Sequence, residues 1–182
     1  MAPNSYSAYV YVDANYIRSR LKEVGQPAHF NPSHLWQHLS AVTTDSQMIR
    51  PTRMFFYDAI DENASEQEKK DLQVYLENVE QISYVAVVTG FVRPGKKKRR
   101  EQKGVDVQIA VDALEAAWSG RADAIILVAG DADFCPLAEA VRRAGAFMLV
   151  FGYQHAMSAE LRHSADVVGY LPDPREGHLK SF

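Results

Sequence analysis

The stretch Ile126–Gly145, ILVAGDADFCPLAEAVRRAG, says more about the fold than any other part of the sequence. Its apolar beginning is short and rich in β-branched residues, which predicts a buried strand over residues 124–129. The turn Gly130-Asp131-Ala132-Asp133 follows, and a helical pattern then runs from Phe134 to Gly145. A buried strand that leads through a short acidic turn into a helix is typical of a parallel sheet with crossover helices.

The same alternation of short apolar runs and helical segments extends in both directions. Further strands are predicted over residues 8–12, 53–59, 84–92, 147–151 and 167–170, and further helices over residues 16–24, 33–42, 105–118 and 158–163. A capping box over Ser65–Glu68 predicts one more helix, whose apolar stripe is Leu72, Tyr75, Leu76 and Val79. The whole pattern favours an α/β fold with a mostly parallel central sheet.

Length and composition limit the classes of protein to consider. The 182 residues suit one α/β domain over 1–182, with a core at about 8–170 and a loosely held tail at 171–182. A net charge of −3 means that any nucleic-acid binding must come from a local basic patch. The single cysteine, Cys135, excludes an internal disulfide and a multi-cysteine zinc site. Neither a signal peptide nor a membrane span is visible, so we expect a cytoplasmic protein without a membrane partner.

Carboxylates lie at the predicted strand ends. Asp13 follows the first strand, Asp131 and Asp133 follow the fourth, and Asp106 lies in the first turn of the helix over residues 105–118. Ligands of open parallel sheets bind at the carboxyl ends of the strands, so these acids can meet there. Such a cluster repels itself unless a cation neutralises it, and all-oxygen ligands select Mg²⁺ or Mn²⁺. Taken singly, each acid is also a plausible turn or helix-capping residue, Asp133 above all.

A run of cations precedes the helix that carries Asp106. Residues 93–100 are predicted as a loop, in which the consecutive cations are Lys96, Lys97, Lys98, Arg99 and Arg100, and Lys103 follows shortly after. Next to the acid cluster, these side chains would attract phosphates without regard to sequence. The alternatives are a solvated loop or a nuclear import signal. Tyr153 and His155 could stack on an unpaired base, although packing within their loop is the preferred interpretation.

Three motifs together resemble a known family. They are YVDANYI (Tyr11–Ile17), KGVDVQIAVDAL (Lys103–Leu114) and the GDAD stretch quoted above, in that order along the chain. They are similar to the NYN domain family (its LabA-like group) of the PIN-like nuclease superfamily. The resemblance implies a Rossmann-like, PIN-type three-layer sandwich and a metal-dependent endoribonuclease. Such an enzyme would hydrolyse RNA, expected to be single-stranded, through in-line attack by activated water.

The resemblance also implies roles for individual residues. By position, the acidic set that binds Mg²⁺ or Mn²⁺ and supports catalysis is Asp13, Asp106, Asp131 and Asp133, with Asn15 as a further catalytic residue and Lys103 as a basic one. Asp112 matches another commonly acidic position. Asp112 lies six positions after Asp106, which turns it about 120° around the helix, so we place it second among the metal ligands.

Two other functions remain open at this point. A non-catalytic RNA-binding or scaffold module could keep the same fold and acids. A Mg²⁺-dependent phosphatase of the haloacid dehalogenase type also ends its strands in acids, but it needs a second Asp where this chain has Asn15. No GxGxxG follows the first strand, which argues against nicotinamide binding. The oligomeric state is not determined by the sequence, and a homodimer is compatible with it.

Overall fold

A computed structural model describes residues 5–61, 64–94, 100–101 and 104–176 and shows a seven-stranded sheet. The strands are β1 (Tyr6–Asp13), β2 (Ile49–Asp61), β3 (Val85–Pro94), β4 (Arg100–Glu101), β5 (Ala124–Val128), β6 (Phe147–Gly152) and β7 (Val167–Tyr170). The helices are α1 (Ala14–Glu23), α2 (Pro32–Gln47), α3 (Glu66–Glu80), α4 (Val105–Trp118), α5 (Cys135–Arg143) and α6 (Ala159–Ser164). Two 3₁₀ turns, η1 (Ala132–Phe134) and η2 (Pro174–Glu176), complete the elements.

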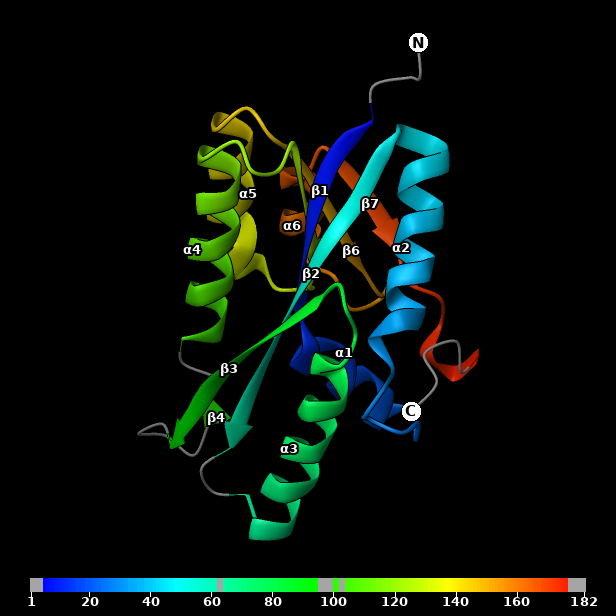
Figure 1. The fold of residues 1–182 in the computed structure, drawn as a ribbon, viewed down its shortest axis with the longest axis vertical. Helices are drawn as coiled ribbons and strands as arrows, with labels where there is room; N and C mark the ends of the chain where they lie inside the picture. Colours follow the sequence, from blue (N-terminus) through cyan, green and yellow to red (C-terminus); the bar gives the residue numbers. More distant parts are fainter. Residues whose placement is uncertain (1–4, 62–63, 95–99, 102–103, 177–182) are drawn as a thin grey trace.

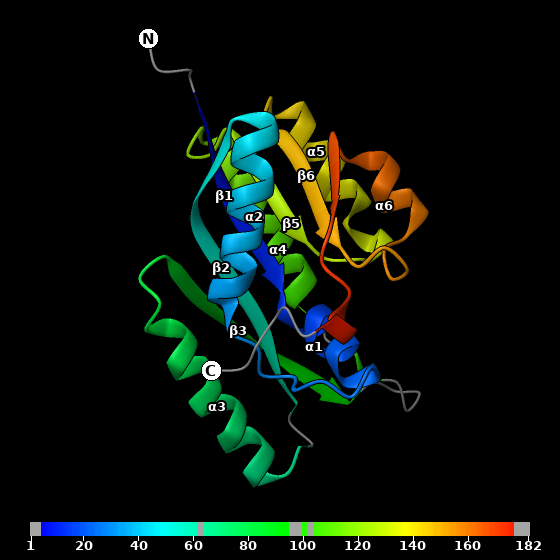
Figure 2. The same cartoon turned by 90° about the vertical axis from the view of Figure 1, so that its right-hand side faces the viewer.

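The sheet separates two layers of helices, as predicted for an α/β fold. One apolar cluster joins a face of the sheet to α1, α2 and α3, and the other joins the opposite face to α4, α5 and α6. Figure 1 shows α4 and α5 on the left of the strands and α2 on the right, and Figure 2 looks onto the side that carries α2. No helix among the described residues is long and apolar enough to cross a membrane.

The order of the strands defines where a ligand can enter. The sheet runs β4-β3-β2-β1-β5-β6-β7, and every pair is parallel except β3 with β4. The chain moves outward from β1 to β3 and then returns to the other side of β1 with β5. The reversal lies between β1 and β5, and the carboxyl ends of the strands at such a point are the usual binding position in open α/β sheets.

Several predicted boundaries were wrong in instructive ways. The predicted loop over 93–100 is partly an antiparallel hairpin, because Arg93 pairs with Glu101 and Pro94 with Arg100. The helix predicted to end at residue 42 continues to Gln47, and the strand predicted over 53–59 extends over residues 49–61. Tertiary packing and strand pairing therefore lengthen elements beyond the limits of their local sequence signals.

Candidate functional site

Asp13 lies at the carboxyl end of β1 and begins α1. Its Oδ1 accepts a hydrogen bond from the backbone N–H of Tyr16 at 3.1 Å, so it is the N-cap of that helix. Desolvation by burial raises the pKa of Asp13 to about 7, and the negative charges of Asp106 and Asp58 contribute to the rise. Asp13 is thus a carboxylate held in position by one oxygen, in surroundings that disfavour its negative charge.

Asp131 and Asp133 follow the neighbouring strand, β5. Asp131 caps the turn η1, because its Oδ1 accepts the backbone N–H of Asp133 at 3.0 Å. The side chain of Asp133 does not cap α5, which begins after Phe134 without a side-chain cap. Asp131 and Asp133 are both exposed at the surface. The capping interpretation therefore applies to Asp131 and not to Asp133, and the latter has no capping role in this segment.

Gly130 fixes the backbone immediately before these acids. A Cβ atom at this position would overlap the carbonyl oxygen of Ala156 and the ring of Tyr16. The carbonyl of Gly130 also accepts the backbone N–H of Ser158 at 2.9 Å. Only glycine permits this close approach, so the residue sets where Asp131 leaves the sheet.

Asp106 reaches the same edge from α4. The helix packs closely on β3, since a Cβ at Gly90 would overlap the side chain of Val105. Asp106 follows in the first helical turn and is half-buried. Desolvation by burial raises the pKa of Asp106, and the charges of Asp131 and Asp133 raise it further.

The electrostatic effects show that the four acids share one region. The negative charge of Asp106 contributes to the raised pKa of Asp13. The charges of Asp131 and Asp133 contribute in the same way to the raised pKa of Asp106. Within the described part of the chain, no three His, Cys, Asp or Glu side chains stand close enough to hold a metal ion as they are oriented. The donors nevertheless suit a hard cation, because they are carboxylates whose charge the protein itself leaves incompletely neutralised.

A fifth acid, Asp58, borders the cluster and was missed from the sequence. It is 1% exposed on β2, and its Oδ2 forms an ion pair of 2.5 Å with Arg18 Nη1. Its Oδ1 accepts the backbone N–H of Ala59 at 2.8 Å. The signal was available, since Asp58 ends the apolar run RMFFYDA beside the strand that carries Asp13. Because both oxygens are engaged, Asp58 acts on the site through its charge and its hold on Arg18.

Asp112 has different surroundings from the other candidate ligands. Its Oδ2 accepts the hydroxyl of Tyr57 at 2.6 Å, and its Oδ1 accepts Gln108 Nε2 at 2.7 Å. The pKa of Tyr57 is raised by burial and by the hydrogen bond to Asp112. Asp112 therefore ties α4 to the sheet, and we leave it outside the metal set considered below.

The remaining predicted residues divide into two groups. Asn15 is exposed in the first turn of α1, beside Asp13. The residues Lys96, Lys97, Lys98, Arg99 and Lys103 lie outside the described residues, as does the side chain of Arg100, whose backbone belongs to β4.

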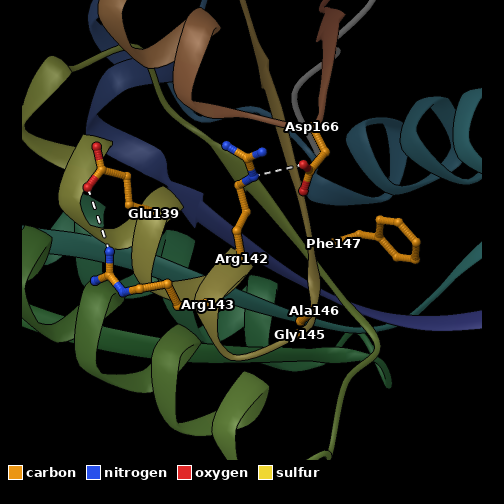
Figure 3. Close-up of a pocket in the computed structure, with 7 residues that line it drawn as sticks. All are labelled: Glu139, Arg142, Arg143, Gly145, Ala146, Phe147 and Asp166. Atoms are coloured by element: carbon orange, nitrogen blue, oxygen red, sulfur yellow. Dashed lines mark ion pairs between the residues drawn. The ribbon is translucent and has the colours of Figure 1, made fainter.

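A cavity of about 590 Å³ lies near the start of β6 (Figure 3). None of the four clustered aspartates lines it. Its charged side chains are mutually paired: Arg142 Nε lies 2.8 Å from Asp166 Oδ1, and Arg143 Nη1 lies 3.7 Å from Glu139 Oε2. The amino ends of the strands form this edge, opposite to the carboxyl ends at which Asp13 and Asp131 lie. We assign this cavity no part in the chemistry of the acid cluster.

Comparison with known proteins identifies the family to which this chain belongs. The NYN domain matches residues 7–171, nearly the whole of the described chain. The chain belongs to the NYN domain family. The NYN assignment predicted from the three motifs is thus confirmed, and with it membership of the PIN-like nucleases.

Two relatives extend the comparison. A protein of unknown function from Vibrio parahaemolyticus has the same fold, with a TM-score of 0.68 and 20% identity over 96% of this chain and 98% of that one. An uncharacterized protein from Methanocaldococcus jannaschii is 30% identical over 82 residues, which is 45% of this chain. The aligned stretch is 34% of that archaeal protein, so the chain spans about a third of its length. The fold is therefore shared with a bacterial protein of similar extent, while the archaeal relative is matched over a part only.

Proposed function

We propose that this NYN protein is a metal-dependent endoribonuclease that hydrolyses RNA at the acid cluster between β1 and β5. The observation that carries the proposal is the placement of four carboxylates at the edge where the order of the strands reverses, with the pKa of Asp13 and Asp106 raised. A fold rarely retains such uncompensated charge unless a ligand uses it. Membership of the NYN family makes a nucleic acid the expected substrate.

The proposed ligands of Mg²⁺ or Mn²⁺ are Asp13, Asp106, Asp131 and Asp133. A divalent ion bound there would neutralise the phosphate, lower the pKa of a coordinated water and stabilise the leaving oxygen. Asp13 and Asp131 each use Oδ1 to cap a helical turn, which orients the carboxyl group and leaves Oδ2 for a cation. Exposed Asp131 and Asp133 can turn toward the ion without disturbing the core.

The protein also positions the substrate. Asn15 is exposed in the first turn of α1, close to the capping carboxylate of Asp13, where its amide can hydrogen-bond a phosphate oxygen or the attacking water. The cations of residues 96–100, with Lys103, would supply affinity for the phosphate backbone that the net charge of −3 does not supply. RNA, single-stranded in particular, is proposed from the resemblance of the motifs, as is the LabA-like group within the family.

The test is cleavage of labelled single-stranded RNA and DNA by the purified protein with Mn²⁺, Mg²⁺ or EDTA. We expect cleavage of RNA with either ion and none with EDTA. Asp106→Asn should abolish cleavage while retaining RNA binding. The matched control is Asp112→Asn on the same helix, whose amide can still accept the hydroxyl of Tyr57 and which should keep cutting.

Equal loss of cleavage in both variants, with both still folded, would contradict the proposed ligand set. RNA binding without cleavage under any metal condition would favour the non-catalytic RNA-binding module instead. Cleavage that survives Asp106→Asn at the level of the wild type would contradict Asp106 as a ligand, and cleavage that also survives Asp13→Asn would show that it does not come from the acid cluster. These outcomes separate the site, the activity and the purity of the sample.

A further inference from the structure

A second cavity lies on the same edge of the sheet as the acid cluster. It has a volume of about 250 Å³ and is lined by residues that include Arg20, Tyr153, Ala156, Tyr170, Leu171 and Arg175. We name it the Tyr170 pocket. Its walls are the loop after β6, the segment after β7 and the carboxyl-terminal half of α1. The backbone N–H of Leu171 donates to the carbonyl of Gly152 at 3.0 Å and joins the two loops.

Tyr16 connects this pocket to the acid cluster. Its backbone N–H donates to Asp13 Oδ1, and its hydroxyl accepts the backbone N–H of Tyr153 at 2.8 Å. The rings of Tyr16 and Tyr153 are in contact, with centroids 5.9 Å apart. Gly130, the residue before Asp131, also packs against the Tyr16 ring. One aromatic side chain therefore separates the pocket from two of the proposed metal ligands.

The chemistry of the Tyr170 pocket suits a neutral aromatic group with hydrogen-bonding edges. Tyr170 is 43% exposed, which leaves a face of its ring available for stacking. Tyr153 is 5% exposed, and its hydroxyl has no hydrogen-bond partner among the described residues. Tyr153 lines the pocket together with Asp173, so the buried hydroxyl belongs to a side chain of the pocket wall. A buried hydroxyl without a partner destabilises a fold, and a ligand would supply that partner.

The charge of the pocket argues against a phosphate as the main occupant. Arg20 Nη1 is paired with Glu23 at 2.6 Å, and Arg175 Nη2 is paired with Asp173 at 2.6 Å. The arginines that line the pocket are therefore already neutralised by acids. Pockets for drug-sized ligands measure about 300–1,000 Å³, so this one suits a smaller, flat group. A nucleobase has that size, two faces that stack and polar edges.

We propose that the Tyr170 pocket binds one unpaired nucleobase of the strand whose backbone lies at the acid cluster, with Tyr170 stacking on the base and Tyr153 bonding its edge. The inference rests on the proposed function, because the position of the strand follows from the acid cluster. It also fits the single-stranded substrate proposed above, since a base in a duplex cannot enter the pocket without leaving its partner. The contact of Tyr153 with the base is made by its hydroxyl, while its ring packs against Tyr16.

The test is the binding of a fluorescent ten-nucleotide single-stranded RNA, measured by anisotropy with Ca²⁺ and repeated with a single abasic site moved along the strand. We expect Tyr170→Ala to weaken binding of the intact strand by at least about five-fold, the low end of base stacking on an aromatic ring. One abasic position should weaken wild-type binding by a similar factor and leave Tyr170→Ala unaffected. Tyr6→Ala is the matched control, because Tyr6 is 44% exposed at the start of β1, on the opposite edge.

Tyr153→Phe provides a second variant with little risk to the fold. It removes only a hydroxyl that lacks a partner among the described residues, so its melting temperature should not fall. Its RNA binding should weaken by about two- to ten-fold, as for the loss of one hydrogen bond. Wild-type affinity in both Tyr170→Ala and Tyr153→Phe would overturn the base pocket.

The cleavage assay distinguishes failure of the pocket from failure of the nuclease proposal. Cleavage by the wild type with unchanged binding and KM in both tyrosine variants overturns the pocket and leaves the nuclease standing. The expected binding pattern without cleavage supports the pocket and overturns the nuclease. A wild-type protein that binds no single-stranded nucleic acid overturns both.

Discussion

Replacing Asp13 by asparagine should stabilise the metal-free protein at neutral and alkaline pH. Burial raises the pKa of Asp13 from 3.8 to about 7, so the folded protein is penalised once this carboxyl group ionises. At about 1.4 kcal/mol per pKa unit, the difference corresponds to about 4 kcal/mol in the free energy of unfolding. The asparagine of the variant carries no charge, and asparagine is as good an N-cap as aspartate.

The sign of the pH dependence follows from the same values. Well below pH 3.8 the carboxyl group is protonated in both the folded and the unfolded state, so Asp13 does not lower the free energy of unfolding. As the pH rises toward 7 the unfolded chain ionises first, so the wild type loses stability relative to Asp13→Asn over this interval. Above pH 7 the difference should stay constant. It corresponds to about 8–16 °C in melting temperature for a chain of this size.

The assay is urea or thermal unfolding of both proteins in EDTA at several pH values between 4.5 and 8.5. Adding Mn²⁺ at about one hundred times its Kd should raise the free energy of unfolding of the wild type by about 2.7 kcal/mol and that of Asp13→Asn by little. Asp71→Asn on the exposed face of α3 is the control, with an expected change below about 0.5 kcal/mol. A difference between wild type and Asp13→Asn that does not vary with pH, or that favours the wild type above pH 7, would refute the reasoning.

Three further predictions concern the surroundings of the site. Arg18→Met should lower the free energy of unfolding by about 3–5 kcal/mol in urea titrations, because Asp58 is 1% exposed and loses its ion pair; a loss below about 1 kcal/mol would show that Asp58 tolerates burial alone. Tyr57→Phe should cost about 1–3 kcal/mol by the same measurement, since Asp112 loses a hydrogen bond of 2.6 Å, and RNA cleavage should persist. Replacing residues 96–100 by serine should lower the slope of log affinity against log salt by about 0.7 for each lost phosphate contact, with Mn²⁺ affinity unchanged; an unchanged slope would assign these cations another role.

The sequence by itself determined most of the fold. Hydrophobic periodicity located every parallel strand, and the helix over 105–118 was placed at its observed ends. The capping box at Ser65 is present, with the side chain of Glu68 returning to the backbone of Ser65. These signals lie within single segments of the sequence, so they can be recognised without knowing which other elements each segment packs against. The central strands are buried on both faces, which gives continuous apolar runs that are easy to recognise.

The sequence also determined that four of the acids share the edge of the sheet, although it did not reveal Asp58 beside them. Asp13, Asp131 and Asp133 follow strands directly, and parallel strands place their carboxyl ends together. The position of Asp106 at the same edge was predicted from its place in the first turn of α4. What these positions bind remains a proposal, but their meeting at one edge follows from connectivity alone.

Tertiary structure alone decided the contacts between segments that are distant in the sequence. The ion pair of Asp58 with Arg18 joins residues 40 positions apart, and the hydrogen bond of Tyr57 to Asp112 joins residues 55 apart. No periodicity encodes such pairs, because they depend on the order of strands and on the angle at which helices cross the sheet. For the same reason the sequence drew attention to Tyr153 and His155 but not to the pocket that they form with Tyr170, because the loops after β6 and β7 come together only when both strands are in register.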